Sequence, residues 1–230
     1  MNVSLDNKVI WFSPECTGGH IIRNIFKNFG FYRFDTEKGS KLTPLDNSVE
    51  SSSNVLSEIY QNFSKIATVR NPYDRVWCCY CDFYTKTLDN RNFEHTKEKF
   101  DYFLRNAFIE KSDGIILDPL FSQNSYFSKW TFNDLQVDRV IRFEYMEQDL
   151  TNLEFLKNNL SCDKISYLRM ELAKMKNPFD FEKLYTIQNA RKIYEFYKKY
   201  FIDFDYDPFS FTTEEISERD KIKFIHGYDF

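Results

Sequence analysis

The sequence has no long apolar run. No stretch approaches the roughly 18 apolar residues that a membrane-spanning helix needs, and the amino-terminal segment MNVSLDNKVIWF lacks the apolar core of a signal peptide. We therefore expect a cytoplasmic protein with no membrane partner. Hydrophobic residues nevertheless make up 42% of the 230-residue chain and aromatic residues 19%, which predicts one packed domain over residues 1–230 rather than a disordered chain.

The sequence also has no excess of positive charge, since 31 Lys and Arg residues stand against 35 Asp and Glu residues, which gives a formal net charge of −4 at pH 7 and a sequence pI of about 5.5. Domains that bind nucleic acid usually present a basic face. The composition therefore argues against a general nucleic-acid binder, and we expect no nucleic-acid partner. A local basic pocket remains compatible with this balance, because net charge describes no single cleft.

Cysteine is uncommon and unevenly placed. The five cysteines form an odd set, and three of them cluster in the segment CCYC at 78–81. With no export signal, this pattern favours reduced thiols over disulfides. Zinc is a weak alternative, because CCYC has a poor ligand spacing and no second cysteine or histidine pair follows at finger distance. We expect no metal site.

Apolar periodicity predicts alternating strands and helices. Short buried strands are expected at 8–12, 31–34, 65–69 and 138–144, and helices at about 21–28, 54–63, 72–84, 97–109, 146–160 and 189–201. Two surface loops are expected, one over 36–54 and one around Gly114 and Pro119. Strands that alternate with helices are typical of an α/β fold with a largely parallel central sheet and helices on both faces.

Two of the six glycines, Gly18 and Gly19, stand together in SPECTGGHIIRNIF at 13–26, directly after the first predicted strand. A glycine turn between a strand and a helix exposes backbone N–H groups at the positive end of the helix dipole, which makes it a phosphate cradle. The alternative is that the glycines only allow the chain to turn. The Walker A pattern and GxGxxG are both absent, which disfavours an ATPase or a Rossmann dehydrogenase.

A second segment, RNPYDR at 70–75, places Arg70 at the carboxyl end of a predicted strand and Pro72 in the first turn of a helix. In an open parallel sheet, strand carboxyl ends and helix N-termini share one ligand crevice. Arg70 and the Thr17–His20 turn are therefore expected to face the same ligand. The alternative for Arg70 is a solvated or ion-paired arginine at the surface.

Together these two segments resemble the cofactor loops of the PAPS-dependent sulfotransferases, particularly the carbohydrate, or second-type, family. PAPS is 3'-phosphoadenosine 5'-phosphosulfate. In that family a PKTGGTS loop binds the 5'-phosphosulfate and RNPYDRxxSxY binds the 3'-phosphate. Here TGG at 17–19 and RNPYDRVWCCY at 70–80 match these loops, and the stretches 118–127, 137–153 and 190–209 resemble later parts of the family.

The resemblance implies a P-loop-like three-layer α/β fold, PAPS or 3',5'-ADP as the nucleotide, and a carbohydrate or small-molecule acceptor. It assigns the nucleotide contacts to two groups of residues, Cys16, Thr17, Gly18, Gly19, His20 and Ile21 in the first loop and Arg70 and Cys78 in the second.

The chain departs from the family pattern at polar positions. Cys16 replaces the lysine two residues before the first glycine of TGG, and His20 replaces the following Thr or Ser. Cys78 replaces the serine that helps to hold the 3'-phosphate, and Glu50 stands at best where the family often has a histidine. The chain therefore resembles a sulfotransferase whose polar cofactor contacts are partly rewritten.

Two residues are candidates for catalysis. His20 is expected to supply the missing positive charge if it is protonated beside a dianion, with a structural helix-start histidine as the alternative. Arg23 is a second stand-in, with an outward-facing surface role as its alternative. Glu50 is the candidate base for the acceptor hydroxyl, with a solvated loop glutamate as its alternative, and His95 is its rival.

The resemblance implies a PAPS-dependent sulfotransferase. One alternative is a sulfotransferase-like protein that binds a nucleotide or a glycan without turnover, as the same residues allow. Another is a phosphotransferase of the nucleotide-kinase type, which the missing Walker A lysine and Ser/Thr oppose.

Overall fold

A computed structural model describes residues 2–35, 41–44, 49–50, 61–87, 94–112, 114–118, 137–157, 161–175 and 181–227. The chain divides into two compact units. The first unit comprises Met1–Arg70 and Phe132–Lys176, and the second comprises Asn71–Thr131 and Asn177–Phe230. One domain can contain two such units, so the expected single domain stays a prediction.

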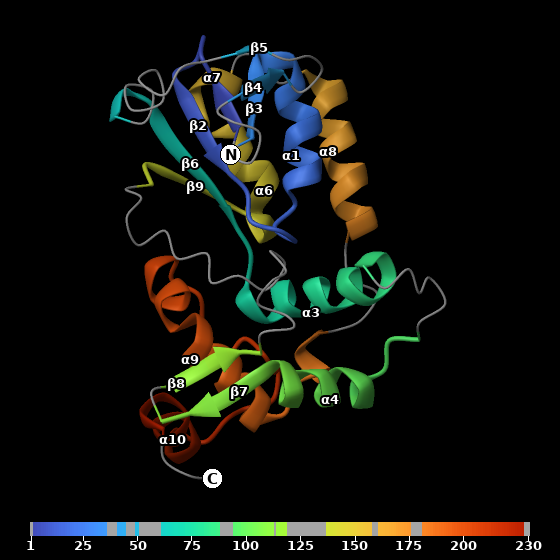
Figure 1. Cartoon of the computed structure of the whole chain (residues 1–230), viewed down its shortest axis with the longest axis vertical. Coiled ribbons are helices and arrows are strands. Elements are labelled where there is room, and N and C mark those ends of the chain that lie inside the picture. Colours follow the sequence, from blue (N-terminus) through green and yellow to red (C-terminus); the bar gives the residue numbers. More distant parts are fainter. Residues whose placement is uncertain are drawn as a thin grey trace. The chain divides into compact units, whose positions relative to one another are not determined.

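The first unit contains a seven-stranded sheet in the order β5-β4-β3-β1-β2-β6-β9 (Figure 1). Its strands are β1 (Asn2–Ser4), β2 (Val9–Phe12), β3 (Phe31–Asp35), β4 (Lys41–Pro44), β5 (Val49–Glu50), β6 (Ser64–Val69) and β9 (Arg139–Arg142). The pairs β2·β6 and β6·β9 are parallel, whereas β1·β2, β1·β3, β3·β4 and β4·β5 are antiparallel. The fold is therefore mixed α/β.

The expected largely parallel sheet is thus right only for β2, β6 and β9. The other four strands are joined by antiparallel pairs, and the sequential pairs β1·β2, β3·β4 and β4·β5 have connections too short for a parallel crossover. Between β1 and β2, for example, only a turn over residues 5–8 is available, closed by the amide of Lys8 donating to the carbonyl of Leu5 over 3.3 Å. A parallel crossover needs a dozen or more residues.

The four predicted strands are confirmed, as β2, β3, β6 and β9. The expected surface loop over 36–54 is wrong at 41–44 and 49–50, which form β4 and β5, and the loop around Gly114 is wrong at 114–117, which form a strand. Each of these strands has two to four residues, and alternation over so short a run is too weak to recognise. Pro119 and residues 54–60 lie outside the described residues.

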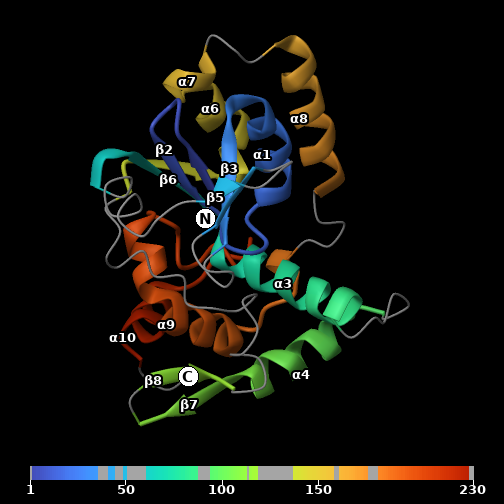
Figure 2. The same cartoon turned by 45° about the horizontal axis from the view of Figure 1, so that its top comes forward.

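The helices of the first unit are α1 (Gly19–Phe26), α6 (Met146–Thr151), α7 (Glu154–Lys157) and α8 (Cys162–Met175). Helices α1 and α8 lie side by side (Figure 2). All four helices pack into one core with side chains from a single face of the sheet, among them Trp11, Ile66 and Ile141. The opposite face carries Ile10 and Val69, which are also fully buried. A three-layer arrangement stays a prediction.

The second unit contains α3 (Pro72–Asp82), the π-helical turn η2 (Phe83–Thr87), α4 (Lys97–Ala107), α9 (Ile187–Asp203), α10 (Glu218–His226) and the hairpin of β7 (Phe108–Lys111) and β8 (Gly114–Leu117). Its core is mainly aromatic. Phe100 packs its ring against those of Trp77, Tyr80 and Tyr185, with centroids 4.8, 5.1 and 5.3 Å away. Such pairs add to the free energy gained by burying the rings.

Tyrosines in this core keep their hydroxyls hydrogen-bonded. Tyr73 donates its hydroxyl to the carbonyl of Pro208 over 2.7 Å, and Tyr185 donates to the carbonyl of Tyr73 over 2.8 Å. Burial raises the pKa of both phenols well above the usual value. Both hydroxyls therefore act as neutral donors that join α3 to later parts of the chain.

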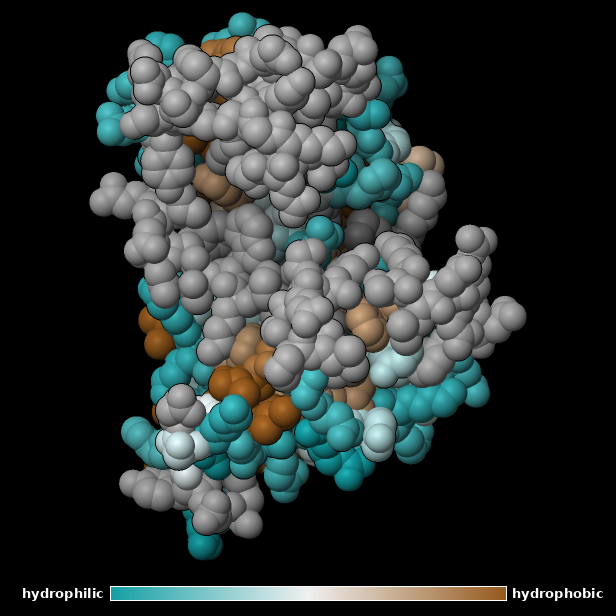
Figure 3. Space-filling model, in the orientation of Figure 1, coloured by the Kyte–Doolittle hydropathy of each residue, from teal (hydrophilic) through white to brown (hydrophobic). Residues whose placement is uncertain are grey.

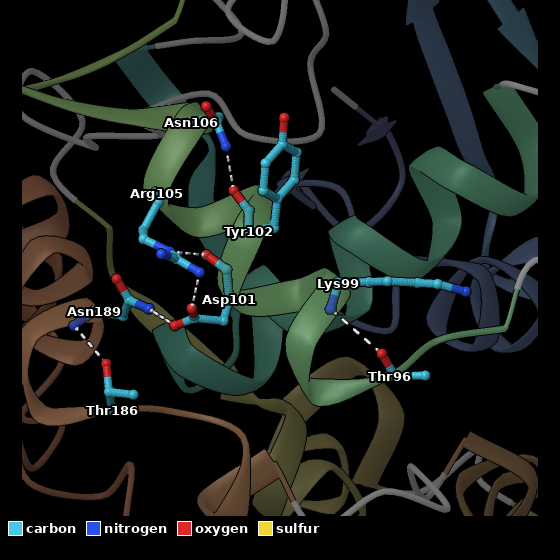
Figure 4. Close-up of polar contacts among 8 residues, drawn as sticks. All are labelled: Thr96, Lys99, Asp101, Tyr102, Arg105, Asn106, Thr186 and Asn189. Atoms are coloured by element: carbon cyan, nitrogen blue, oxygen red, sulfur yellow. Dashed lines mark hydrogen bonds and ion pairs between the residues drawn. The ribbon is translucent and has the colours of Figure 1, made fainter.

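Polar contacts join α4 to α9 (Figure 4). The carboxylate of Asp101 accepts a hydrogen bond from Asn189 Nδ2 and forms an ion pair of 2.6 Å with Arg105. Thr186 caps α9 by accepting from the amide of Asn189 over 3.2 Å, and Thr96 caps α4 in the same way. The start of α9 is thus fixed on α4.

Most helices were predicted at the correct place in the sequence, but the residues at which they begin and end were predicted less well. The expected helices at 72–84 and 189–201 correspond to α3 and α9. The helix expected at 97–109 ends at Ala107, and the one expected at 146–160 is divided into α6 and α7. Helices α8 and α10 were not expected. Among the described residues, no helix combines the length and apolarity needed to cross a membrane.

Candidate functional site

The candidate site of the first unit is the loop that follows β2. Thr17 is fully buried, and its hydroxyl donates to the carbonyl of Pro14 over 2.7 Å. The backbone is left-handed at Cys16, with φ of 62°, and at Gly18, with φ of 82°. A conformation that ordinary side chains avoid therefore lies two residues before the glycine that caps α1.

Each glycine has a local structural reason. A Cβ at Gly18 would lie 2.5 Å from Met146 Cε and 2.8 Å from Phe143 Cδ2. A Cβ at Gly19 would overlap the hydroxyl of Ser13. The alternative stated above, that the glycines allow the turn, is thus sufficient to explain them, and phosphate binding stays a prediction.

The loop leads into the N-terminus of α1, where no side chain caps the helix and the first turn contains no acidic residue. The carbonyl of Gly18 accepts from the amides of Ile21 and Ile22 over 3.0 and 3.3 Å. The amides of the first turn form the positive end of the helix dipole, and a helix end of this kind can bind an anion.

Arg70 and the loop meet at one edge of the sheet. Strands β2 and β6 are adjacent and parallel, so Phe12 and Val69 end them at the same side. Arg70 Nη1 donates to the carbonyl of Cys16 over 3.0 Å, and the guanidinium lies 4.0 Å from the centroid of the Phe143 ring. The expected proximity of Arg70 to the loop is confirmed.

The environment of Arg70 excludes the alternative of a solvated arginine at the surface. Only 2% of the residue is exposed, so it is not a surface arginine. At least one of its N–H groups supports the loop. Arg70 therefore stabilises the loop through this hydrogen bond, and its role in binding an anion stays a prediction.

The other predicted residues of the first loop lie on different sides of α1. Ile21 is fully buried in the core of the first unit, so only its backbone is close to the turn. His20 is exposed, with Nε2 3.5 Å from Asn24 Nδ2. Arg23 is half-buried, and its Nε has no hydrogen-bond partner among the described residues.

The structure does not bring Glu50 to the loop. Glu50 ends β5, the edge strand, and β4, β3 and β1 lie between β5 and β2. The expectation that Glu50 lies in a polar loop is wrong, because its backbone pairs with Lys41. Cys78 belongs to α3 of the second unit and is partly exposed. The proposed role of Cys78 stays a prediction.

His95, the rival base, is packed in the aromatic core of the second unit. Its Nε2 lies 3.3 Å from Thr85 Oγ1, and its ring meets those of Trp77 and Tyr80. Burial, with a smaller contribution from the charge of Lys99, lowers the pKa of the imidazole. Within the described ranges, no group of three or more His, Cys, Asp or Glu side chains is arranged to hold a metal ion.

Sequence reasoning missed the residues that hold the loop in place, namely Ser13, Phe143 and Met146. Ser13 and the ring of Phe143 lie beside the glycines, and Met146 Cε packs against Gly18. Phe143 directly follows β9, and Met146 follows three residues later at the start of α6. This position was the available signal, because residues after three adjacent parallel strands meet at one sheet edge.

Comparison of the chain with protein-family models, with curated proteins and with solved structures gives no match. The resemblance to sulfotransferases therefore depends on the sequence motifs alone.

Proposed function

We propose that the protein is a PAPS-dependent sulfotransferase with a P-loop-like three-layer fold, which transfers a sulfuryl group to a hydroxyl of a carbohydrate or small metabolite. One observation carries the proposal. The loop that resembles a 5'-phosphosulfate site and the arginine that resembles a 3'-phosphate ligand are joined by the 3.0 Å hydrogen bond from Arg70 to Cys16. Two anion-binding groups at one sheet edge suit a nucleotide with phosphates at both ends.

The residues have distinct parts in this proposal. The amides at the start of α1 donate hydrogen bonds to the 5'-phosphosulfate, which is anionic and is attracted by the positive end of the helix dipole. The guanidinium of Arg70, which resembles the family's 3'-phosphate ligand, has the planar geometry that suits a bidentate contact with a phosphate. His20, exposed on the first turn, supplies a positive charge when it is protonated.

Transfer then follows from the chemistry of the sulfuryl group. The acceptor oxygen forms a bond to sulfur while the bond from sulfur to the 5'-phosphate oxygen breaks, leaving 3',5'-ADP. The acceptor proton passes to a base other than Glu50, because β4, β3 and β1 separate the strand of Glu50 from the loop that follows β2. Charge grows on the leaving phosphate oxygen, and the amides of α1 stabilise it.

A second candidate function is nucleotide binding without turnover. It is favoured by the loop itself, because Cys16 stands where the family has a lysine and its carbonyl is already bonded to Arg70. Loss of one preorganised donor to the developing charge typically costs about 10²–10³-fold in rate. A thiol offers no positive charge in its place.

Calorimetric titration with 3',5'-ADP tests the nucleotide site that both candidates share. We expect Arg70→Ala to weaken binding by about 2 kcal/mol or more, because a charge-assisted hydrogen bond is lost. Arg139→Gln is the matched control, since Arg139 is an exposed arginine on the neighbouring strand β9. Unchanged affinity in a folded Arg70→Ala variant would remove the site assignment.

A turnover assay with PAPS and a panel of hydroxyl acceptors separates the two candidates. We expect transfer by the natural chain and faster transfer after Cys16→Lys, because the lysine restores the missing cation. Tight binding of 3',5'-ADP with no transfer by either form would favour the binding protein. Failure to bind the nucleotide at all would contradict both.

A further inference from the structure

The second unit contains a pocket of about 770 Å³ between the β7–β8 hairpin, α9 and α10. Pockets for small organic ligands usually have about 300–1,000 Å³. On the face seen in Figure 3, the region of α4 and the hairpin is mainly hydrophilic with a hydrophobic patch among it. The charged side chains that line the pocket are Glu110, Lys111, Arg191, Lys192, Glu195 and Lys198.

The charge of the lining is opposite to that of the whole chain. Among the described residues that line the pocket, four cationic side chains accompany two carboxylates, whereas the chain as a whole has a formal net charge of −4. His226, at the end of α10, adds a further positive charge when it is protonated. A concave site with an excess of one charge concentrates ligands of the other sign.

The end of α10 lies close to the side chain of Arg191. Gly227 caps the helix with φ of 81°, and a Cβ at this position would lie 2.7 Å from Arg191 Nη2. The absence of a side chain thus lets the guanidinium lie against the backbone of the helix end. Arg191 Nη2 therefore lies close to Gly227, and both residues line the pocket.

The two carboxylates lie near cations of the same pocket. Lys192 Nζ lies 3.4 Å from Glu110 Oε1, and Lys198 Nζ lies 3.9 Å from Glu195 Oε2. Ion pairs this long and partly exposed are weak. The two lysines can therefore bind an anionic ligand instead. Lys111 makes no ion pair with any other described residue.

We propose that this pocket binds a small sugar that carries a phosphate or sulfate ester. Arginine and lysine bind the tetrahedral oxyanion, and the carboxylates of Glu110 and Glu195 accept hydrogen bonds from sugar hydroxyls. An inorganic anion would use only the cations, and a neutral sugar would leave them unpaired. The inference does not rest on the proposed sulfotransferase activity.

Calorimetric titration of the full chain tests the proposal with glucose 6-phosphate, glucose 6-sulfate, inorganic phosphate, inorganic sulfate and glucose. We expect one or both esters to bind at least about tenfold more tightly than the matching inorganic anion or glucose, a difference of one decade in Kd. The two ester arms identify which oxyanion the pocket prefers.

Two variants place the binding in the pocket. We expect Lys111→Gln and Arg191→Gln each to weaken ester binding about tenfold. Lys199→Gln is the matched control, because Lys199 lies on α9, pairs with Asp203 over 2.8 Å and does not line the pocket. If Arg191→Gln does not fold, Lys111→Gln on the hairpin still tests whether the ester binds in the pocket.

Amide chemical shifts give a second readout that separates this site from the nucleotide loop. Of the six glycines, Gly114 and Gly227 line the pocket and Gly18 and Gly19 lie in the loop. We expect the ester to shift the first two amides only. Ester binding no tighter than inorganic anions, equal losses in Lys199→Gln and Lys111→Gln, or shifts confined to Gly18 and Gly19 would each overturn the proposal.

Discussion

The two units differ in how they use charged side chains. In the first, Arg70 is buried and braces the Cys16 loop. In the second, lysine and arginine side chains line a pocket of about 770 Å³. Arg70, which a sequence motif singled out, thus stabilises a loop. The cationic side chains of the second unit belong to no recognised motif, yet they line a pocket.

The cores differ as well. The first unit packs mainly aliphatic side chains of α1, α6, α7 and α8 on one face of the sheet. The second unit packs aromatic rings between helices, with Phe100 at the centre of several ring contacts. Rings bury more area per residue than aliphatic side chains. A single truncation should therefore be most harmful in the second unit.

The largest effect is expected for Phe100→Ala. Phe100 is fully buried, and the variant should lose about 3–5 kcal/mol of unfolding free energy through lost contacts and a cavity. Urea unfolding measures the loss. Tyr102→Ala is the control on the same helix, since Tyr102 is 66% exposed and should change stability little. Equal losses in the two variants would mean that the aromatic core does not hold the unit.

Arg70→Ala should come next, with a loss of about 2–4 kcal/mol, because it removes a buried charged hydrogen bond and a cation–π contact with Phe143. Arg70→Lys should lose less, since it retains the charge but not the planar group. Unfolding of the free protein in urea measures both. A loss of unfolding free energy below that of the exposed control Arg139→Ala would show that Arg70 does not stabilise the loop.

A smaller loss, about 1–3 kcal/mol, is expected for Gly18→Ala. The new Cβ must adopt a left-handed conformation and also meets Met146 and Phe143. Gly30→Ala is the matched control, because Gly30 has φ of 64° and faces only the end of the Asp6 side chain. The difference between the two variants measures how tightly the loop is packed, and no difference would contradict the packing.

The smallest effect concerns pH and the second unit. Burial lowers the pKa of His95 from its ordinary value of 6.5, so below pH 6.5 the unfolded chain binds more protons than the folded one. His95 should therefore lower stability progressively as the pH falls from 6.5 through its folded pKa. His95→Gln should flatten this slope in unfolding curves recorded at several pH values, and an unchanged slope would contradict the assignment.

Much of the first unit was predictable from the sequence, because buried runs such as 65–69 have few alternatives to a strand. The helix start at Pro72 was predictable too, from proline at the first helical position. The mixed sheet was missed because β1, β4 and β5 have only two to four residues. In runs this short, tertiary pairing rather than local preference decides the structure.

The site was predictable only in part. The motifs indicated that Arg70 and the Cys16 loop meet, since strand ends share an edge. They gave no information on the burial of Arg70, which depends on Phe143, a residue more than 70 positions later. The pocket of the second unit was not predicted, because its cations come from β7 and α9, which are far apart in the sequence.

The two units alternate along the chain, since each is assembled from two stretches with a piece of the other between them. Synthesis of the first 70 residues on the ribosome therefore leaves β6 without its neighbour β9, and the rings of α3 and α4 emerge before α9 is made. Neither unit can be completed while only half of the polypeptide exists. No single proteolytic cut can release either unit intact, so truncated forms should depend on chaperones or be degraded.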